Sequence, residues 1–143
     1  MSSHVYYLDM NPEPWKRPVH YNNHVYDSQK LLKTNIGLFI TKQHGNLPKW
    51  EGPLRIFLFF NIAMPEGRKG RKRVGQAHMF KPDIDNLQKL YLDAITRSGV
   101  IHDDCQFCEL HASKSYARKG HIVIKIENFE ENNEENSANK DKK

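Results

Sequence analysis

The chain has 143 residues, of which 38% are hydrophobic and 27% are charged, and its 22 Lys and Arg against 17 Asp and Glu give a formal net charge of +5. A chain of this length buries about two-thirds of its unfolded surface in one core, which excludes a mini-protein held by disulfides or a structural metal. No apolar run reaches the roughly 20 residues of a membrane helix, and the N-terminus lacks a secretion-signal pattern. With only two cysteines, a reducing cytoplasmic setting without a membrane partner is expected.

The positive charge is concentrated in one place. The first 127 residues carry 19 bases and 12 acids, a net charge of +7, whereas the stretch from Asn128 onward holds five acids and three bases. Five of the bases fall within six positions, namely Arg68, Lys69, Arg71, Lys72 and Arg73. Such a segment is typical of contact with a polyanion, and a solvated loop without a partner is the alternative.

The N-terminal half predicts a strand, a helix and a second strand. A strand is expected over 4–9, and the prolines at 12, 14 and 18 exclude its regular continuation. A helix over 28–44 is expected to begin at a cap residue, Asp27 or Ser28, and to bury its apolar positions, which are Leu31, Leu32, Ile36, Phe39 and Ile40. The run 54–62 is apolar on both faces at its centre, as in a central strand.

The C-terminal half begins with a basic loop over 64–81. A helix then follows Pro82 and ends before Gly99, with Ile84, Leu87, Tyr91, Ala94 and Ile95 on one stripe. Strands are predicted over 106–116 and 121–127, and the tail 129–143 is expected to be disordered. These elements predict an α+β domain over 1–128, with a small mixed sheet of about four strands and two main helices.

Acidic side chains gather around the second helix. Asp83 and Asp85 lie at its start and Lys89 one turn further, so both carboxylates could reach one ion. The same acids could instead only cap the helix and complement its dipole. The pair Asp103-Asp104 follows the helix, roughly 20 Å from its start by helix rise. A shared site therefore requires the helix to end early or a second subunit to contribute.

Clusters of carboxylates without His or Cys suit Mg²⁺ or Mn²⁺, and these ions usually act on phosphates. Carboxylates that hold an ion, a nearby cation and a basic segment are what metal-assisted phosphodiester hydrolysis requires. The sequence supplies all three between Arg68 and Asp104.

The string KPDIDNLQKLYLDAI, followed by GVIHDDCQ and by Lys114-x-Tyr116, resembles the RusA family of Holliday junction resolvases, and VYDSQKL at 25–31 matches the entrance to the family's first helix. The resemblance covers roughly residues 4–127. It implies an intertwined homodimer of α+β subunits, encoded by bacteria or phage and associated with the nucleoid, that cuts four-way DNA junctions symmetrically with Mg²⁺. It also implies that Asp83, Asp85 and Asp104 bind the metal and that Lys89 is catalytic, while a contribution from Asp103 stays open.

A zinc site made of His102, Cys105, Cys108 and His111 is the competing motif. We expect no zinc, because successive members of this series would face opposite sides of a strand. Cys108 is expected to be a buried strand residue. Two aromatics, Tyr21 and Phe80, are expected to pack in the core, with stacking on unpaired bases as the alternative.

The leading hypothesis is therefore a Mg²⁺-dependent, structure-selective endonuclease of branched DNA. DNA contacts are expected from Lys81 as well as from the basic segment. Lys89 could stabilise charge at the phosphate or could only orient Asp85 through an ion pair between residues four apart. The rival hypothesis is a DNA-binding protein without catalysis, in which the acids act only as helix caps.

Overall fold

The computed structural model describes residues 2–65 and 73–129. A four-stranded sheet in the order β1-β6-β4-β5 carries two helices, and a separate hairpin joins β2 and β3. The elements are β1 (Ser3–Leu8), β2 (Val19–Tyr21), β3 (His24–Tyr26), α1 (Lys30–His44), β4 (Leu54–Ala63), α3 (Ile84–Ser98), the 3₁₀ turn η1 (Asp104–Gln106), β5 (Phe107–Ala117) and β6 (His121–Asn128). The predicted α+β fold is confirmed. The predicted tail lies almost entirely outside the described residues, as do residues 66–72 of the basic loop.

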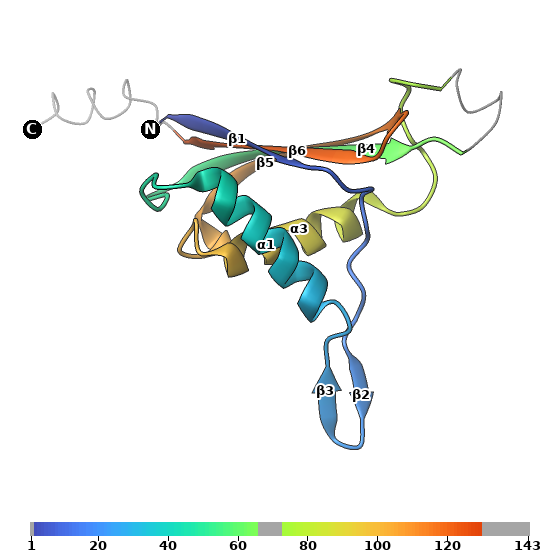
Figure 1. Ribbon diagram of the computed structural model, residues 1–143, viewed down its shortest axis with the longest axis horizontal. Coiled ribbons are helices and arrows are strands. Elements are labelled where there is room, and N and C mark those ends of the chain that lie inside the picture. Colours follow the sequence, from blue (N-terminus) through green and yellow to red (C-terminus); the bar gives the residue numbers. More distant parts are fainter. Residues whose placement is uncertain (1, 66–72, 130–143) are drawn as a thin grey trace, which may run out of the picture.

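Both helices cover the same face of the sheet (Figure 1). β4 lies between β5, to which it is parallel, and β6, to which it is antiparallel, so the prediction of a central strand is confirmed. Side chains alternate along these strands. The core-facing set is fully or nearly fully buried: Leu54, Ile56, Leu58, Phe60 and Ile62 on β4, and Ile122, Ile124 and Ile126 on β6.

The other face of the sheet is not covered by either helix. Phe59 of β4 is exposed there, and Phe57 is half-buried because His111 stacks on its ring, with centroids 4.9 Å apart. On this second face of β4, a side chain of the sheet itself thus shields Phe57 but leaves Phe59 exposed. No helix within 2–65 or 73–129 is long and apolar enough to cross a membrane.

The prediction of which side chains of α1 are buried is partly wrong. Ile36 and Ile40 are buried as expected, but Leu31 and Phe39 are largely exposed. The buried stripe instead includes Gly37, where an added Cβ would lie 3.3 Å from the Ala94 carbonyl oxygen of α3. The close approach of the two helices at this glycine rotates α1 and turns Leu31 and Phe39 outward.

The β2–β3 hairpin was not predicted. Prolines precede it, but Asn22 and Asn23 both adopt positive φ, at 47° and 63°, which closes a two-residue hairpin turn. Tyr21 is 73% exposed, so its expected burial in the core is wrong. The hairpin projects away from the sheet beyond the start of α1 (Figure 1).

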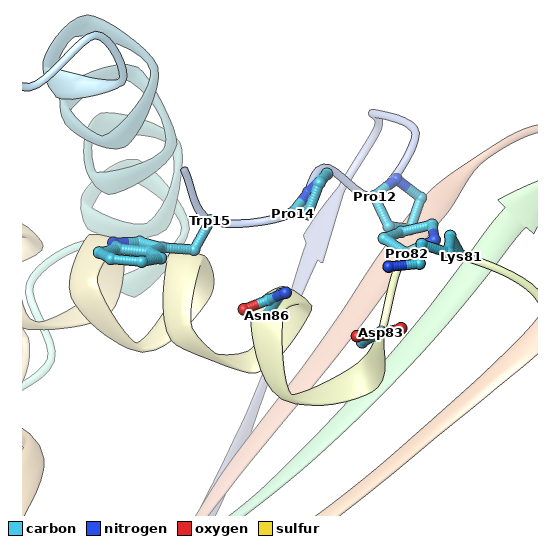
Figure 2. A pocket seen from close by; sticks show the side chains of 7 residues that line it. All are labelled: Pro12, Pro14, Trp15, Lys81, Pro82, Asp83 and Asn86. Carbon is cyan, nitrogen blue, oxygen red and sulfur yellow. The ribbon is translucent and has the colours of Figure 1, made fainter. Parts of the chain in front are cut away.

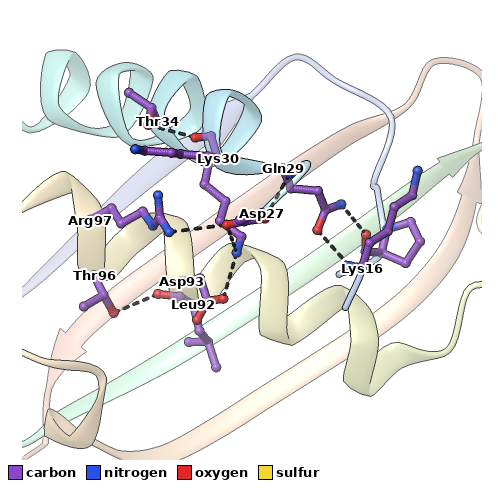
Figure 3. Close-up of polar contacts among 11 residues, drawn as sticks. Lys16, Asp27, Gln29, Lys30, Thr34, Leu92, Asp93, Thr96 and Arg97 are labelled. Carbon is purple, nitrogen blue, oxygen red and sulfur yellow. Dashed lines mark hydrogen bonds and ion pairs between the residues drawn. The ribbon is translucent and has the colours of Figure 1, made fainter. Parts of the chain in front are cut away.

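A buried lysine ties the two helices together. The Lys33 ammonium of α1 lies 3.1 Å from a carboxylate oxygen of Asp27 and 3.4 Å from one of Asp93 on α3. Arg97 of α3 also reaches Asp27, at 3.4 Å (Figure 3). Burial opposes ionisation of Asp27, but the Gln29 N–H and the two cations outweigh it and hold the pKa of Asp27 below its ordinary value. This network fixes the start of α1 against the middle of α3.

We expect Lys33→Met to destabilise the fold by about 2–4 kcal/mol. Removing one partner of a fully buried ion pair costs about 3–5 kcal/mol, and the partial exposure of the two acids reduces this figure. Urea unfolding measures the loss. Lys30→Met, an exposed change on the same helix, is the matched control and should shift stability by less than about 0.5 kcal/mol. Equal losses in the two variants would contradict a stabilising role for the network.

Candidate active site

The start of α3 is formed by the segment that the sequence singled out. Asp83 is the N-cap residue, with extended backbone angles, yet its side chain makes no capping hydrogen bond. The Lys81-Pro82 peptide bond before it is cis. Since an acid that only serves the helix would accept a bond from a free backbone N–H of the first turn, capping does not account for the Asp83 carboxylate.

This carboxylate lines an open pocket of about 450 Å³, a size typical of ligand sites. Figure 2 shows the lining residues, which come from two distant parts of the chain: Pro12, Pro14 and Trp15 precede α1, and Lys81, Pro82, Asp83 and Asn86 lie at the start of α3. The pocket thus combines one acid and one base with several apolar side chains.

Asp85 and Lys89 continue along α3 but do not pair with each other. An Asp85 carboxylate oxygen accepts a hydrogen bond from the Asn86 N–H at 3.0 Å, and the side chain is exposed. The Lys89 ammonium instead lies over the Trp15 indole, 3.6 Å from the ring centroid. Among the described residues, Lys89 forms no ion pair, so its suggested role of orienting Asp85 has no support in the geometry.

Lys114 of β5 anchors the turn that leads into the helix. Its ammonium donates to the carbonyl oxygens of Phe80 and Pro82, both at 2.8 Å. Phe80 itself is 55% exposed, so its expected burial is wrong. Nearby His78 is buried, and burial, followed by the charge of Lys114, lowers the pKa of its imidazole. The sequence offered Lys114 only as part of its Lys-x-Tyr pattern and gave no reason to place it here.

The second acidic pair lies at the other end of α3. Asp103 caps the 3₁₀ turn by accepting the Cys105 N–H at 3.1 Å, and its carboxyl group can share one proton with that of Asp104 in a hydrogen bond. This bond, then burial, then the negative charges of Asp103 and Asp93, raise the pKa of Asp104. The bond to Asp104 and the Cys105 N–H lower the pKa of Asp103. Asp104 is therefore the carboxylate of the pair that more readily keeps a proton.

One chain does not bring the predicted metal ligands together. Asp104 lies close enough to Asp93 to feel its charge, and Asp93 is ten residues, about 15 Å along the helix axis, from Asp83. Within the described ranges, no group of three or more His, Cys, Asp or Glu could hold a metal ion. Because α3 runs unbroken to Ser98, an early helix end does not relieve the separation.

The predicted DNA-binding residues are only partly described. Lys81 is exposed at the pocket beside Asp83, and the Arg73 guanidinium lies 5.9 Å from the centroid of the Tyr116 ring. Arg68, Lys69, Arg71 and Lys72 lie outside the described residues.

The expected burial of Cys108 is wrong, because its side chain is exposed. A bulge between Leu54 and Arg55 explains this: Leu54 pairs with Phe107 and Arg55 with Glu109, so Cys108 has no partner residue on β4. Of the two histidines in the competing zinc motif, His102 contacts the carboxylate of Glu51 and His111 contacts that of Glu109.

A comparison with protein-family models identifies the family of the chain. The model of the family described as endodeoxyribonuclease RusA matches residues 9–127. The chain belongs to this family. Among curated proteins, none matches the chain.

As a RusA protein, the chain is an endodeoxyribonuclease that resolves Holliday junctions. The predictions of the family and of an enzyme are confirmed, and the hypothesis of a DNA-binding protein without catalysis is not favoured. Trp15 is a residue of the Asp83 pocket that the sequence did not single out. It lies 74 positions before Lys89, and no local pattern joins the two.

Proposed function

We propose that the chain cuts four-way DNA junctions by paired, Mg²⁺-dependent phosphodiester hydrolysis, with Mn²⁺ as a substitute ion. The observation that carries this proposal is the Asp83 carboxylate, which is not used as a cap and lines an open pocket beside Lys81. A ligand set of carboxylate oxygens alone suits these hard ions. We assign the ligands to Asp83 and Asp85 of one subunit and to Asp104 of the partner subunit, since Asp103 caps its own turn.

When bound, the ion would supply a water of lowered pKa and would offset charge on the phosphate. The chain's own groups have separate tasks. Lys89 offers ammonium N–H donors for the negative charge that develops on the phosphate oxygens. Lys81, Arg73 and the four bases between 68 and 72 attract and hold the DNA backbone.

The separation of the acids along α3 supports the proposal of a homodimer. Of the fourteen large hydrophobic side chains that are exposed among the described residues, seven fall within the segment 19–39 of the hairpin and α1: Val19, Tyr21, Val25, Tyr26, Leu31, Leu38 and Phe39. An isolated two-stranded hairpin is marginally stable in water, and clustered apolar surface is typical of protein contacts. We propose that a second copy of the chain covers this surface.

A synthetic four-way junction and a linear duplex of matched sequence test the function. With Mg²⁺, we expect symmetric nicks in two opposed strands of the junction and no cutting of the duplex. With EDTA in place of Mg²⁺, we expect the junction to be bound but not cut. Undiminished cleavage in EDTA would overturn the metal assignment, and equal cutting of the duplex would overturn the selectivity for junctions.

A further inference from the structure

The side chain of Lys89 is held by an aromatic ring rather than by an acid. Its ammonium is 3.6 Å from the centroid of the half-buried Trp15 indole, well within the range of a cation–π contact. A carboxylate partner would offset the positive charge and occupy N–H donors. The face of an indole attracts the ammonium without neutralising it. The positive charge of Lys89 and its N–H donors therefore stay available to an anionic ligand.

The backbone of Trp15 is fixed relative to the helix that carries Lys89. The Trp15 N–H donates to the carbonyl oxygen of Asn86 at 2.9 Å, and Asn86 lies one turn before Lys89. The preceding Glu13 N–H donates to the Tyr91 hydroxyl at 3.1 Å. These bonds keep the indole over α3.

The flanking residues are fixed to the start of α1 as well. The amide of the buried Gln29 bridges both sides of Trp15: its oxygen accepts the Lys16 N–H at 2.7 Å and its nitrogen donates to the Pro14 carbonyl oxygen at 2.9 Å (Figure 3). The segment that carries Pro14, Trp15 and Lys16 is thus held between the two helices. The Trp15 indole also lines the pocket that Asp83 lines (Figure 2).

We propose that Trp15 is a positioning residue: its indole holds the Lys89 ammonium, still charged and free to donate, beside the pocket where the phosphate binds. This inference rests on the proposed function, in which Lys89 contacts the phosphate. A flexible lysine samples many side-chain conformations, and the ring restricts it to one before the DNA arrives. The effect is on the rate of the chemical step rather than on DNA affinity.

A matched pair of substitutions separates this role from packing, because Trp15 also contacts the core. Phe and Met are similar in size and hydrophobicity, but only Phe presents a π face. We expect Trp15→Phe to cleave a saturating junction within about threefold of wild type and Trp15→Met to be slower by about tenfold, in line with the strength of cation–π contacts. The thermal midpoints and junction affinities of the two variants should agree.

A control and a second measurement complete the test. Phe57→Met removes a remote ring that lies 5.6 Å from the Lys125 ammonium, and it should leave the rate unchanged. In NMR spectra of lysine-labelled protein, the Lys89 methylene protons next to the ammonium should be shifted upfield by the indole. That shift, assigned with Lys89→Arg, should be lost in Trp15→Met.

Equal rates for Trp15→Phe and Trp15→Met would overturn the proposal, and so would the absence of an upfield shift in the wild-type protein. A Lys89→Met variant as active as wild type would overturn the roles of both Lys89 and Trp15 while leaving metal-dependent cleavage intact. Failure of the wild-type protein to cut junctions in Mg²⁺ would instead refute the proposed function, and the NMR shift would still report whether the indole holds the lysine.

Discussion

Asp83→Asn is expected to slow junction cleavage by at least about a hundredfold while the fold stays intact. Loss of residues that merely support metal ligands costs about 10- to 100-fold, so loss of a ligand itself should cost more. An amide is a poor ligand for Mg²⁺, yet Asn suits an N-cap position as well as Asp does. Because Asp83 makes no capping bond, the change removes no hydrogen bond of the helix.

Single-turnover cleavage of a four-way junction, together with a thermal melt, measures both parts of this prediction. The loss of one negative charge near the helix N-terminus should cost only about 0.3–1 kcal/mol of stability. Asp9→Asn is the matched control, since Asp9 is an exposed aspartate that pairs with Lys119, outside the site. If Asp83→Asn cut junctions as fast as the wild type, Asp83 would not be a metal ligand.

The parts of the fold that followed from sequence are those set by local periodicity. The apolar stripe of α3, the left-handed Gly99 at its end and the alternating isoleucines of β6 each specify an element without help from distant residues. Those patterns correctly predicted two helices and a mixed four-stranded sheet.

The errors arose where contacts between distant segments override the local pattern. Gly37 allows α1 to approach α3 and changes which face of α1 is buried, and a bulge against β4 turns Cys108 outward. Neither effect leaves a periodic signal in its own segment. The β2–β3 hairpin was missed for a local reason, since two asparagines close a turn that glycine more often closes.

For the candidate site too, local sequence predicted some features, whereas others depend on contacts between distant residues. Asp83 at the helix start followed from Pro82, because a proline favours an extended conformation at the residue before it, Lys81, so that Asp83 lies at the entrance of the helix. The cation–π contact of Lys89 and the anchoring of the turn by Lys114 depend on residues more than 30 positions away. The sequence could therefore nominate the acids but could not show which groups hold the lysine and the loop.

A mixture of Asp83→Asn and Asp104→Asn proteins is expected to regain cleavage that neither protein has alone. In a twofold-symmetric dimer, each site takes Asp83 from one subunit and Asp104 from the other. A heterodimer of the two variants therefore has one site with both changes and one site with neither. If subunits exchange at random, about one quarter of the wild-type number of intact sites is restored.

The form of a cleaved plasmid distinguishes cleavage restored in heterodimers from residual activity of the single variants. A supercoiled plasmid that extrudes a cruciform is linearised when both sites of a dimer cut, whereas a heterodimer with one intact site should leave nicked circles. Mixing Asp83→Asn with Asp85→Asn is the control: both ligands come from the same end of α3, so every site keeps one change and the mixture should stay inactive. If the first mixture were as inactive as its components, each site would be built within one chain. Asp93, whose charge Asp104 feels, lies ten residues or about 15 Å of helix from Asp83, so α3 would then have to move to bring Asp104 to Asp83.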